Sequence, residues 1–116
     1  MSRAGTETTE DRIFKALANP VRRALLDALK DRPQTTGELC AAFPALDRCT
    51  VMQHLKVLEK SGLVRSRKAG RVRTYSIEPQ QLKLAEDWLE RQRSMWVRRL
   101  DRLDSYLMKM KEENSE

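Results

Sequence analysis

Apolar residues recur with the period of an α-helix through the first third of the chain. Three short apolar stripes follow one another, and a helix-start signal precedes each of them. The three signals are Thr8 with Asp11, Asn19 followed by Pro20, and Thr35 with Glu38. Pro33 lies after the second stripe and Pro44 after the third, where each would stop a helix. The pattern predicts three short helices, the third ending near Phe43.

A fourth helix is predicted between Asp47 and Gly62. Asp47 is a good N-cap residue, and Gly62 suits the C′ position because glycine tolerates a positive φ. Val51, Leu55 and Leu58 share one face of this helix, which must therefore be buried. The opposite face combines hydrogen-bonding, apolar and cationic side chains: Cys49, Met52, Gln53, Lys56 and Lys60. Because residues 44–46 leave only a tight turn before it, the third and fourth helices have helix-turn-helix spacing.

A basic β-hairpin follows the fourth helix. Residues 63–67 and 71–77 are predicted to be two strands around a turn at 68–70, where Gly70 can take a positive φ. The basic side chains are Arg65 and Arg67 on one side of the first strand, Arg71 and Arg73 on one side of the second, and Lys68 at the tip. Such a ribbon can lie along nucleic-acid phosphates or enter a minor groove. The alternative is a charged sheet edge that only prevents edge-to-edge pairing.

From about residue 80 to residue 109 the pattern predicts one long amphipathic helix. Its apolar stripe mostly alternates steps of three and four residues: Leu82, Ala85, Leu89, Trp96, Leu100, Leu103, Leu107 and Met110, with Gln92 in the missing position. Trp88 and Met95 widen the stripe. A helix of roughly thirty residues would be about 45 Å long, which is more than one small domain can cover.

The uncovered part of this stripe predicts a homodimer. Its expected interface residues are Trp88, Leu89, Trp96, Leu100, Leu103 and Leu107. Two copies would place two reading heads about one DNA turn apart on a pseudo-palindromic site. Two alternatives remain open: a ligand pocket at Trp88 and Trp96 in the dimer interface, or a different protein as the partner of the long helix.

The basic charge is concentrated in one stretch of the chain. Residues 48–73 carry eight basic side chains and one acidic side chain, a net charge of +7, whereas the whole chain carries +6. A solvated charged face is the simpler interpretation of such a run, but its position on a helix and an adjacent hairpin favours double-stranded DNA as the partner. Arg48 is suited to a guanine or the backbone, Gln53 to an adenine edge or a phosphate, and Lys56 to a phosphate.

The composition limits the class of protein to which the chain can belong. A chain of 116 residues, 40% hydrophobic and 5% aromatic, has room for one domain with a modest core. We expect an N-terminal tail over residues 1–8, a single domain over 9–111 that includes the long helix at about 80–110, and a frayed end at 112–116. No apolar run is long enough for a membrane span and no secretory signal is seen, so a cytoplasmic protein without a membrane partner is expected. With one histidine and no nucleophile–base set, no enzyme is expected.

Four segments resemble the ArsR family of bacterial winged helix-turn-helix repressors. These are residues 14–26 (FKALANPVRRALL), 36–39 (TGEL), 51–64 (VMQHLKVLEKSGLV) and 70–75 (GRVRTY), and the resemblance spans about residues 10–110. It implies a mainly α fold with a small two-stranded β-hairpin, which is a winged helix-turn-helix domain with a long C-terminal dimerisation helix. It also implies a homodimeric repressor that binds an inverted-repeat operator, including its own promoter, and leaves it when a signal arrives.

The resemblance also implies which residues contact DNA. In this family the fourth helix enters the major groove, which makes candidates of Arg48, Cys49, Thr50, Met52, Gln53, His54 and Lys56. The hairpin would be the wing, with backbone contacts from Arg67, Lys68, Arg71 and Arg73.

The signal that would release the DNA is not evident. Metal-sensing members of the family place several cysteines after the Glu-Leu of the third helix or Asp and His ligands on the last helix. Here Glu38 and Leu39 are followed by Cys40 alone, and the last helix has no histidine, so neither a metal site nor a cofactor is expected. The alternative is a thiol-responsive or metal-responsive sensor, in which a helix N-terminus and Arg48 would activate Cys49. The small-molecule effector is unknown.

Overall fold

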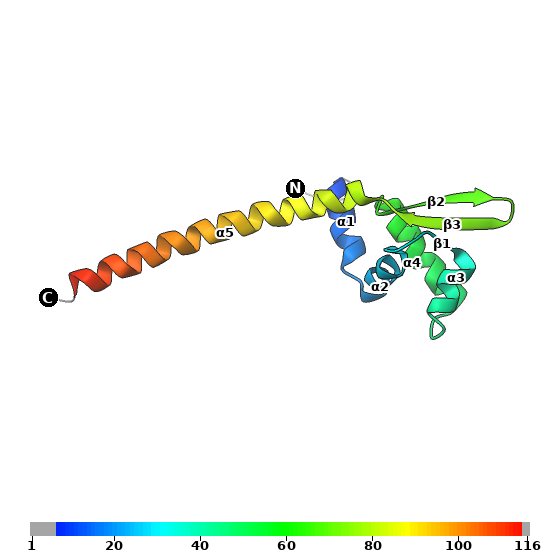
Figure 1. The fold of residues 1–116 in the computed structure, drawn as a ribbon, viewed down its shortest axis with the longest axis horizontal. Helices are drawn as coiled ribbons and strands as arrows, with labels where there is room; N and C mark the ends of the chain where they lie inside the picture. Colours follow the sequence, from blue (N-terminus) through cyan, green and yellow to red (C-terminus); the bar gives the residue numbers. More distant parts are fainter. Residues whose placement is uncertain (1–6, 115–116) are drawn as a thin grey trace. The chain divides into compact units, whose positions relative to one another are not determined.

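The computed structural model describes residues 7–114, so most of the expected tail at residues 1–8 lies outside the described part. Within it, helices and strands follow the order shown in Figure 1: α1 (Thr9–Leu17), α2 (Pro20–Leu29), β1 (Gln34–Thr35), α3 (Thr36–Ala42), α4 (Arg48–Lys60), β2 (Val64–Ala69), β3 (Val72–Ile77) and α5 (Pro79–Glu113). The chain divides into two compact units, residues up to 85 and residues from 86 onward. The first unit is called the head below.

Side-chain caps confirm the predicted starts of the first four helices. Thr8 and Asp11 form a reciprocal capping box, and so do Thr35 and Glu38. Asn19 Oδ1 accepts hydrogen bonds from the next two free backbone N–H groups at 2.8 and 3.3 Å, with Pro20 in the first turn. These caps satisfy orphan donors locally, which is why short helices begin where the sequence indicates.

The core of the head surrounds α4. Val51, Leu55 and Leu58 are fully buried, as their shared face predicts. Apolar side chains from α1, α2, α3, β2, β3 and the start of α5, and from the residue before β2, pack around them: Ile13, Ala16, Leu25, Leu26, Leu29, Leu39, Leu63, Val64, Tyr75 and Ala85. One face of α4 is therefore fixed by packing, and most of the opposite face is exposed.

The fold class is confirmed as mainly helical with a wing, but the sheet has three strands rather than two. Its order is β1-β3-β2, and all neighbours are antiparallel. The extra strand β1 pairs Gln34 with Tyr75 and Thr35 with Thr74. It contains only two residues, so it carries no periodic signal that the sequence could show. Figure 1 shows β2 and β3 continuing beyond it as a two-stranded ribbon.

The wing turn lies further along the chain than predicted. β2 extends to Ala69, which pairs with Val72, so the turn is the two-residue loop Gly70–Arg71 instead of residues 68–70. Gly70 has φ +64° and Arg71 has no positive φ, which matches a turn with glycine at its first central position. Gly62, after α4, has φ +81° as its predicted C′ role requires.

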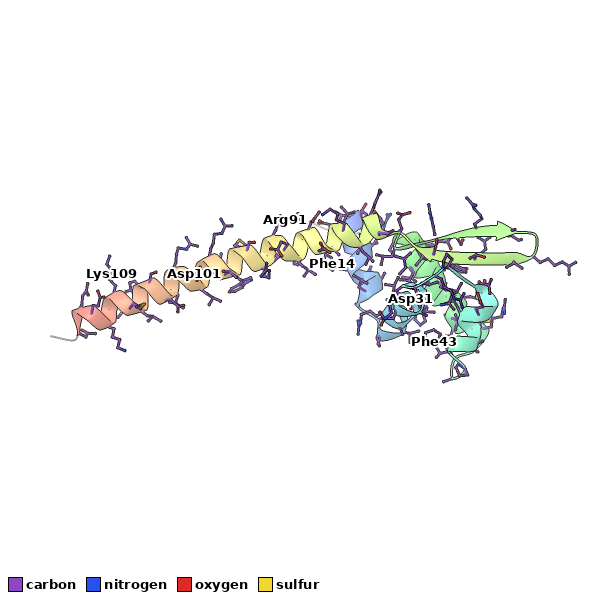
Figure 2. The ribbon with its side chains drawn as sticks, viewed as in Figure 1. Phe14, Asp31, Phe43, Arg91, Asp101 and Lys109 are labelled. Atoms are coloured by element: carbon purple, nitrogen blue, oxygen red, sulfur yellow. The ribbon has the colours of Figure 1, made fainter. Side chains whose placement is uncertain are left out.

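The long helix α5 has 35 residues and continues to Glu113, about four residues beyond its expected end. Residues 110–113 are good helix formers without a breaker, so the helix does not fray where the apolar stripe ends. Ala85 is buried in the head, whereas the apolar side chains from Leu89 onward are exposed. Figure 2 shows side chains projecting above and below this helix along its length, with Arg91, Asp101 and Lys109 labelled on it. Over residues 7–114, no helix combines the length and apolarity that crossing a membrane would need.

Candidate nucleic-acid interface

The first turn of α4 is fixed by its N-cap. The Asp47 carboxylate accepts a hydrogen bond from the Thr50 backbone N–H at 2.7 Å. That backbone hydrogen bond is the main reason why the pKa of Asp47 is held below its usual value. Arg48 and Cys49 follow the cap and are exposed, while Thr50 is half-buried. The N-cap thus fixes the first turn of α4, and the two exposed candidates Arg48 and Cys49 lie in that turn.

A continuous exposed stripe runs along α4 opposite its buried face. It consists of Cys49, Gln53, Lys56 and Lys60, which are spaced by steps of four, three and four residues. All four side chains are exposed, so they lie along one line of the helix surface. A helix presenting hydrogen-bonding and cationic groups along such a line can enter the major groove of B-DNA.

Met52 departs from the expectation. It is half-buried and packs against the core, so it does not belong to the fully exposed face on which the sequence places it. The sequence wheel cannot show this, because the wing covers that edge of the helix. A depression of about 340 Å³ lies there between α4 and β3, lined by Met52, Gln53, Lys56, Glu59, Arg73 and Tyr75.

His54 lies at the other edge of α4, beside α2. Its Nδ1 atom is 3.3 Å from the Nη1 atom of Arg22. Because a guanidinium only donates, Nδ1 is the unprotonated acceptor and His54 is neutral in this arrangement. Burial first, and the positive charge of Arg22 second, lower the pKa of His54 below its usual 6.5.

Arg22 helps to position α4, a role that the sequence does not indicate. Its guanidinium also donates to two carbonyls at the end of α1, from Nε to Ala16 at 2.8 Å and from Nη2 to Lys15 at 3.0 Å. It therefore joins the C-terminus of α1 to α4, and its positive charge suits the negative end of the α1 helix dipole. No sequence signal marks this role, because the three contacts come from two other helices.

The neutral His54 gives a prediction for stability. Its folded-state pKa is lowered, so the unfolded chain binds a proton more readily below pH 6.5. The contribution of neutral His54 to the free energy of unfolding should therefore be fully present above pH 6.5. It should be lost as the pH falls through the folded-state pKa. Urea denaturation at pH 7.5, 6.5 and 5.5 measures this loss. His54→Gln should lose less stability between pH 6.5 and 5.5, and an equal loss in both proteins would contradict the prediction.

The strand register divides the basic side chains of the wing between its two faces. Lys68 is the partner of Arg73, and Arg67 is the partner of Thr74, and cross-strand partners point to the same face. Arg67 and Arg73 therefore lie on opposite faces. Arg71 lies in the turn, not on one side of the second strand as predicted, because the turn is shifted by about one residue. Only Lys68 and Arg73 share the face that carries the buried Tyr75.

A hydrogen-bonded chain joins α4 to the wing across that face. Arg73 Nη1 donates to Ser66 Oγ at 2.7 Å, and Ser66 Oγ donates to Glu59 Oε2 at 2.7 Å. Glu59 is the one acidic residue of the basic stretch 48–73. It holds Arg73 beside the depression through Ser66, and we call this set the Glu59–Ser66–Arg73 chain. The sequence could not reveal it, because its three residues come from three elements.

Several cations of this surface have no acidic partner within the described part of the chain: Arg48, Lys56, Arg67, Lys68 and Arg71. By contrast, Arg65 lies 3.7 Å from the carboxylate of Glu78. Cations without a carboxylate partner are the ones that can neutralise phosphates.

The second unit presents its predicted interface side chains to solvent. The exposed fractions are 55% for Leu89, 57% for Trp96 and 55% for Leu100, and Leu103 and Leu107 are also about half exposed. Trp88 is half-buried. The guanidinium of Arg99 lies 5.6 Å from the centre of the Trp96 ring.

The two cysteines, Cys40 and Cys49, are both free thiols. Cys40 is half-buried against the core, and Cys49 is exposed. Over residues 7–114, no three His, Cys, Asp or Glu side chains are grouped closely enough to hold a metal ion.

Known proteins share this arrangement. A family model described as a helix-turn-helix domain matches residues 17–67. The chain is 39% identical over 95 residues to the HTH-type transcriptional regulator Rv2034 of Mycobacterium tuberculosis, covering 82% of this chain and 85% of that protein. The chain is also similar to the crystal structure of an ArsR family transcriptional regulator, RHA00566, with 40% sequence identity and a TM-score of 0.72. The match covers 77% of this chain and 97% of that chain. The structure of an ArsR-like transcriptional regulator from Rhodococcus sp. RHA1 is 29% identical in sequence, with a TM-score of 0.78. That match covers 93% of this chain and 98% of that chain.

Proposed function

Because the chain belongs to the ArsR family of helix-turn-helix transcriptional regulators, we propose that it is a homodimeric repressor of an inverted-repeat operator. In this proposal α4 enters the major groove, and the wing contacts the flanking backbone. Two copies related by a two-fold axis read the two halves of the operator. The operator includes its own promoter, which makes the protein autoregulatory.

One observation carries the proposal. The exposed stripe of α4 contributes Gln53 and Lys56 to one side of the depression, and the wing contributes Arg73 to the other side. A strand of the DNA backbone between α4 and the wing would meet Lys56 from one side and Arg73 from the other. The bases would then face the stripe that contains Gln53, where an amide can bond to an adenine edge.

The remaining candidates have different roles in this proposal. Arg48, Cys49 and Thr50 lie at the α4 N-terminus that approaches the groove first. His54 and Met52 stand at the two edges of the helix, where they position it and reach the DNA only marginally. Arg67, Lys68 and Arg71 surround the wing tip and contact phosphates.

Fluorescence anisotropy tests the proposal directly. DNA from upstream of the gene is compared with a scrambled duplex of equal length and composition, across a series of salt concentrations. Tighter binding of the upstream DNA at every salt concentration is expected. Equal affinity for both duplexes throughout the series would remove specific operator binding. Sedimentation of the protein alone distinguishes a homodimer from a chain whose long helix needs a different partner protein.

The wing tip gives a sharper prediction. Lys68→Ala removes one phosphate contact, so affinity should fall for operator and scrambled DNA alike, and the slope of log affinity against log salt should decrease by about one. Lys30→Ala is the matched control, since Lys30 is an exposed lysine outside the basic stretch. A Lys68→Ala slope equal to that of the unaltered chain would mean that the wing tip does not touch DNA.

A further inference from the structure

The outer face of the wing, which is the face opposite the buried Tyr75, holds a second depression. It has a volume of about 500 Å³ and is called the outer depression below. The residues lining it are Pro33, Arg65, Ser66, Arg67, Thr74 and Ser76. The Ser66 side chain points to the other face, because Ser66 is the partner of Tyr75. The side chains that line the outer depression are therefore two guanidiniums, two hydroxyls and a proline ring.

The strand register brings the four polar side chains together. Arg65 is the partner of Ser76, and Arg67 is the partner of Thr74. Cross-strand partners are about 5 Å apart, and residues two positions apart along a strand are about 7 Å apart. The four residues thus stand at the corners of a small rectangle, with the arginines along β2 and the hydroxyls along β3. An anion of the size of a phosphate at its centre is within reach of all four side chains.

The hydroxyls of this rectangle are available to a ligand. Thr74 and Ser76 are half-buried, and neither hydroxyl makes a hydrogen bond with residues 7–114. The Ser66 hydroxyl on the other face is, by contrast, bonded to Glu59 and Arg73. Each free hydroxyl can donate one hydrogen bond, and a guanidinium can donate two parallel ones to an oxyanion. Donors on both strands match the oxygens of a tetrahedral phosphate group.

Glu78 is the acidic residue that competes for this site. Its carboxylate lies 3.7 Å from Nη1 of Arg65, whose side chain is 75% exposed. An ion pair exposed to this extent is weak, so a phosphate dianion can take Arg65 from it. The carboxylate also repels a bound phosphate, which means that neutralising Glu78 should strengthen phosphate binding.

We propose that the outer depression binds the phosphate group of a small phosphorylated ligand, and that the bound ligand weakens the hold of the wing on DNA. The volume falls within the range of about 300–1,000 Å³ that is usual for small-ligand pockets, so an organic body fits beside the phosphate group. The ligand engages Arg67 and adds up to about two negative charges to the wing. This second effect rests on the proposed function, because it requires Arg67 to contact the operator backbone.

The operator itself is a poorer occupant of the outer depression. In the proposed complex the DNA backbone lies between α4 and Arg73, which is on the other face of the wing. Arg67 is exposed and can reach a flanking phosphate. Thr74 and Ser76 are half-buried, so only a ligand small enough to enter the depression meets both hydroxyls together with the arginines.

Isothermal titration calorimetry of the full-length chain tests the site. Ribose 5-phosphate, inorganic phosphate and ribose are titrated at constant ionic strength. The two phosphate probes should bind once per chain and ribose should not bind. Tighter binding of ribose 5-phosphate assigns the site to a phosphate ester, and equal binding of both probes assigns it to the free anion. The double change Thr74→Val with Ser76→Ala keeps every charge and should weaken binding at least about 10-fold.

Ser66→Ala is the matched control, because it removes a hydroxyl from the other face of the same strand and should leave phosphate binding unchanged. Equal binding by this control and by the double change would overturn the site, since charge alone would then attract the probes. Absence of binding by both phosphate probes would overturn it as well. Glu78→Gln should bind several-fold more tightly than Glu90→Gln, which removes the same charge from α5. This pair decides the question if the double change does not fold.

Anisotropy with operator DNA tests the effect on the wing. At constant ionic strength, ribose 5-phosphate should weaken DNA binding several-fold in the unaltered chain and leave it unchanged in the Thr74→Val, Ser76→Ala variant. Equal weakening in both proteins would overturn this effect, because it would come from screening and not from the site. If the chain shows no specific operator binding at all, the calorimetry still decides whether the outer depression binds phosphate. The site and the proposed function therefore fail separately.

Discussion

A Leu100→Asp variant is expected to sediment as a monomer and to bind operator DNA at least about 100-fold more weakly than the unaltered chain. Leu100 is 55% exposed in the single chain and lies on the uncovered face of α5. In a dimer a carboxylate at this position would be buried without a partner, which costs several kcal/mol. A monomer contacts only one operator half, so it also loses the contacts of the second head. Sedimentation velocity and anisotropy measure the two effects.

Ser105→Asp is the matched control. Ser105 lies nine residues from Trp96, which is half a turn around the helix, and it is exposed. The variant has the same added charge on the same helix but on the face away from the stripe. It should remain dimeric, with operator affinity changed no more than a few-fold. If Leu100→Asp also remains a dimer with unaltered affinity, the apolar face of α5 is not the interface.

The helices of the head could be predicted because their signals are local. A cap such as Asp47 bonds to a backbone N–H three residues away, and the buried face of α4 repeats within the same helix. Neither feature depends on where the chain goes afterwards. Val51, Leu55 and Leu58 are accordingly buried as the sequence predicts.

The missed features depend on contacts between distant residues. Gln34 belongs to a strand only because Tyr75 pairs with it from forty-one positions further along the chain. The sequence does not distinguish Arg22 from the other basic residues, because its three partners are two carbonyls at the C-terminal end of α1 and the ring of His54. Periodicity describes a single element, so it cannot show which side chain of one element meets another.

The wing shows how a small shift changes a site. Its basic side chains are visible in the sequence, but the turn position decides which face each one occupies. Moving the turn to Gly70–Arg71 places Arg73 beside α4 and leaves Arg67 on the other face. The net charge of the region predicts an affinity for DNA, whereas only the register shows which arginine can act together with α4.

Arg73→Ala is expected to weaken operator binding by roughly 10- to 100-fold, since hydrogen bonds to charged groups contribute about 1.5–3 kcal/mol. The change removes a cation from the depression beside α4 and leaves the Glu59 carboxylate there without the guanidinium held through Ser66. Arg65→Ala is the matched control, because Arg65 lies on the opposite face of the wing and pairs with Glu78. Anisotropy should show a much smaller loss for this control, and equal losses would mean that total charge alone matters.

Glu59→Gln decides whether Arg73 also acts by neutralising Glu59. In the unaltered chain Arg73 balances the carboxylate through Ser66, so removing the acid should change affinity little. In the Arg73→Ala background the carboxylate would repel the phosphates, so the same Glu59→Gln change should recover part of the lost affinity. Non-additive free energies in this cycle are the expected result for residues of one network. Strictly additive losses, in variants with unaltered thermal unfolding, would show that the Glu59–Ser66–Arg73 chain holds the wing in place without contributing charge balance at the DNA.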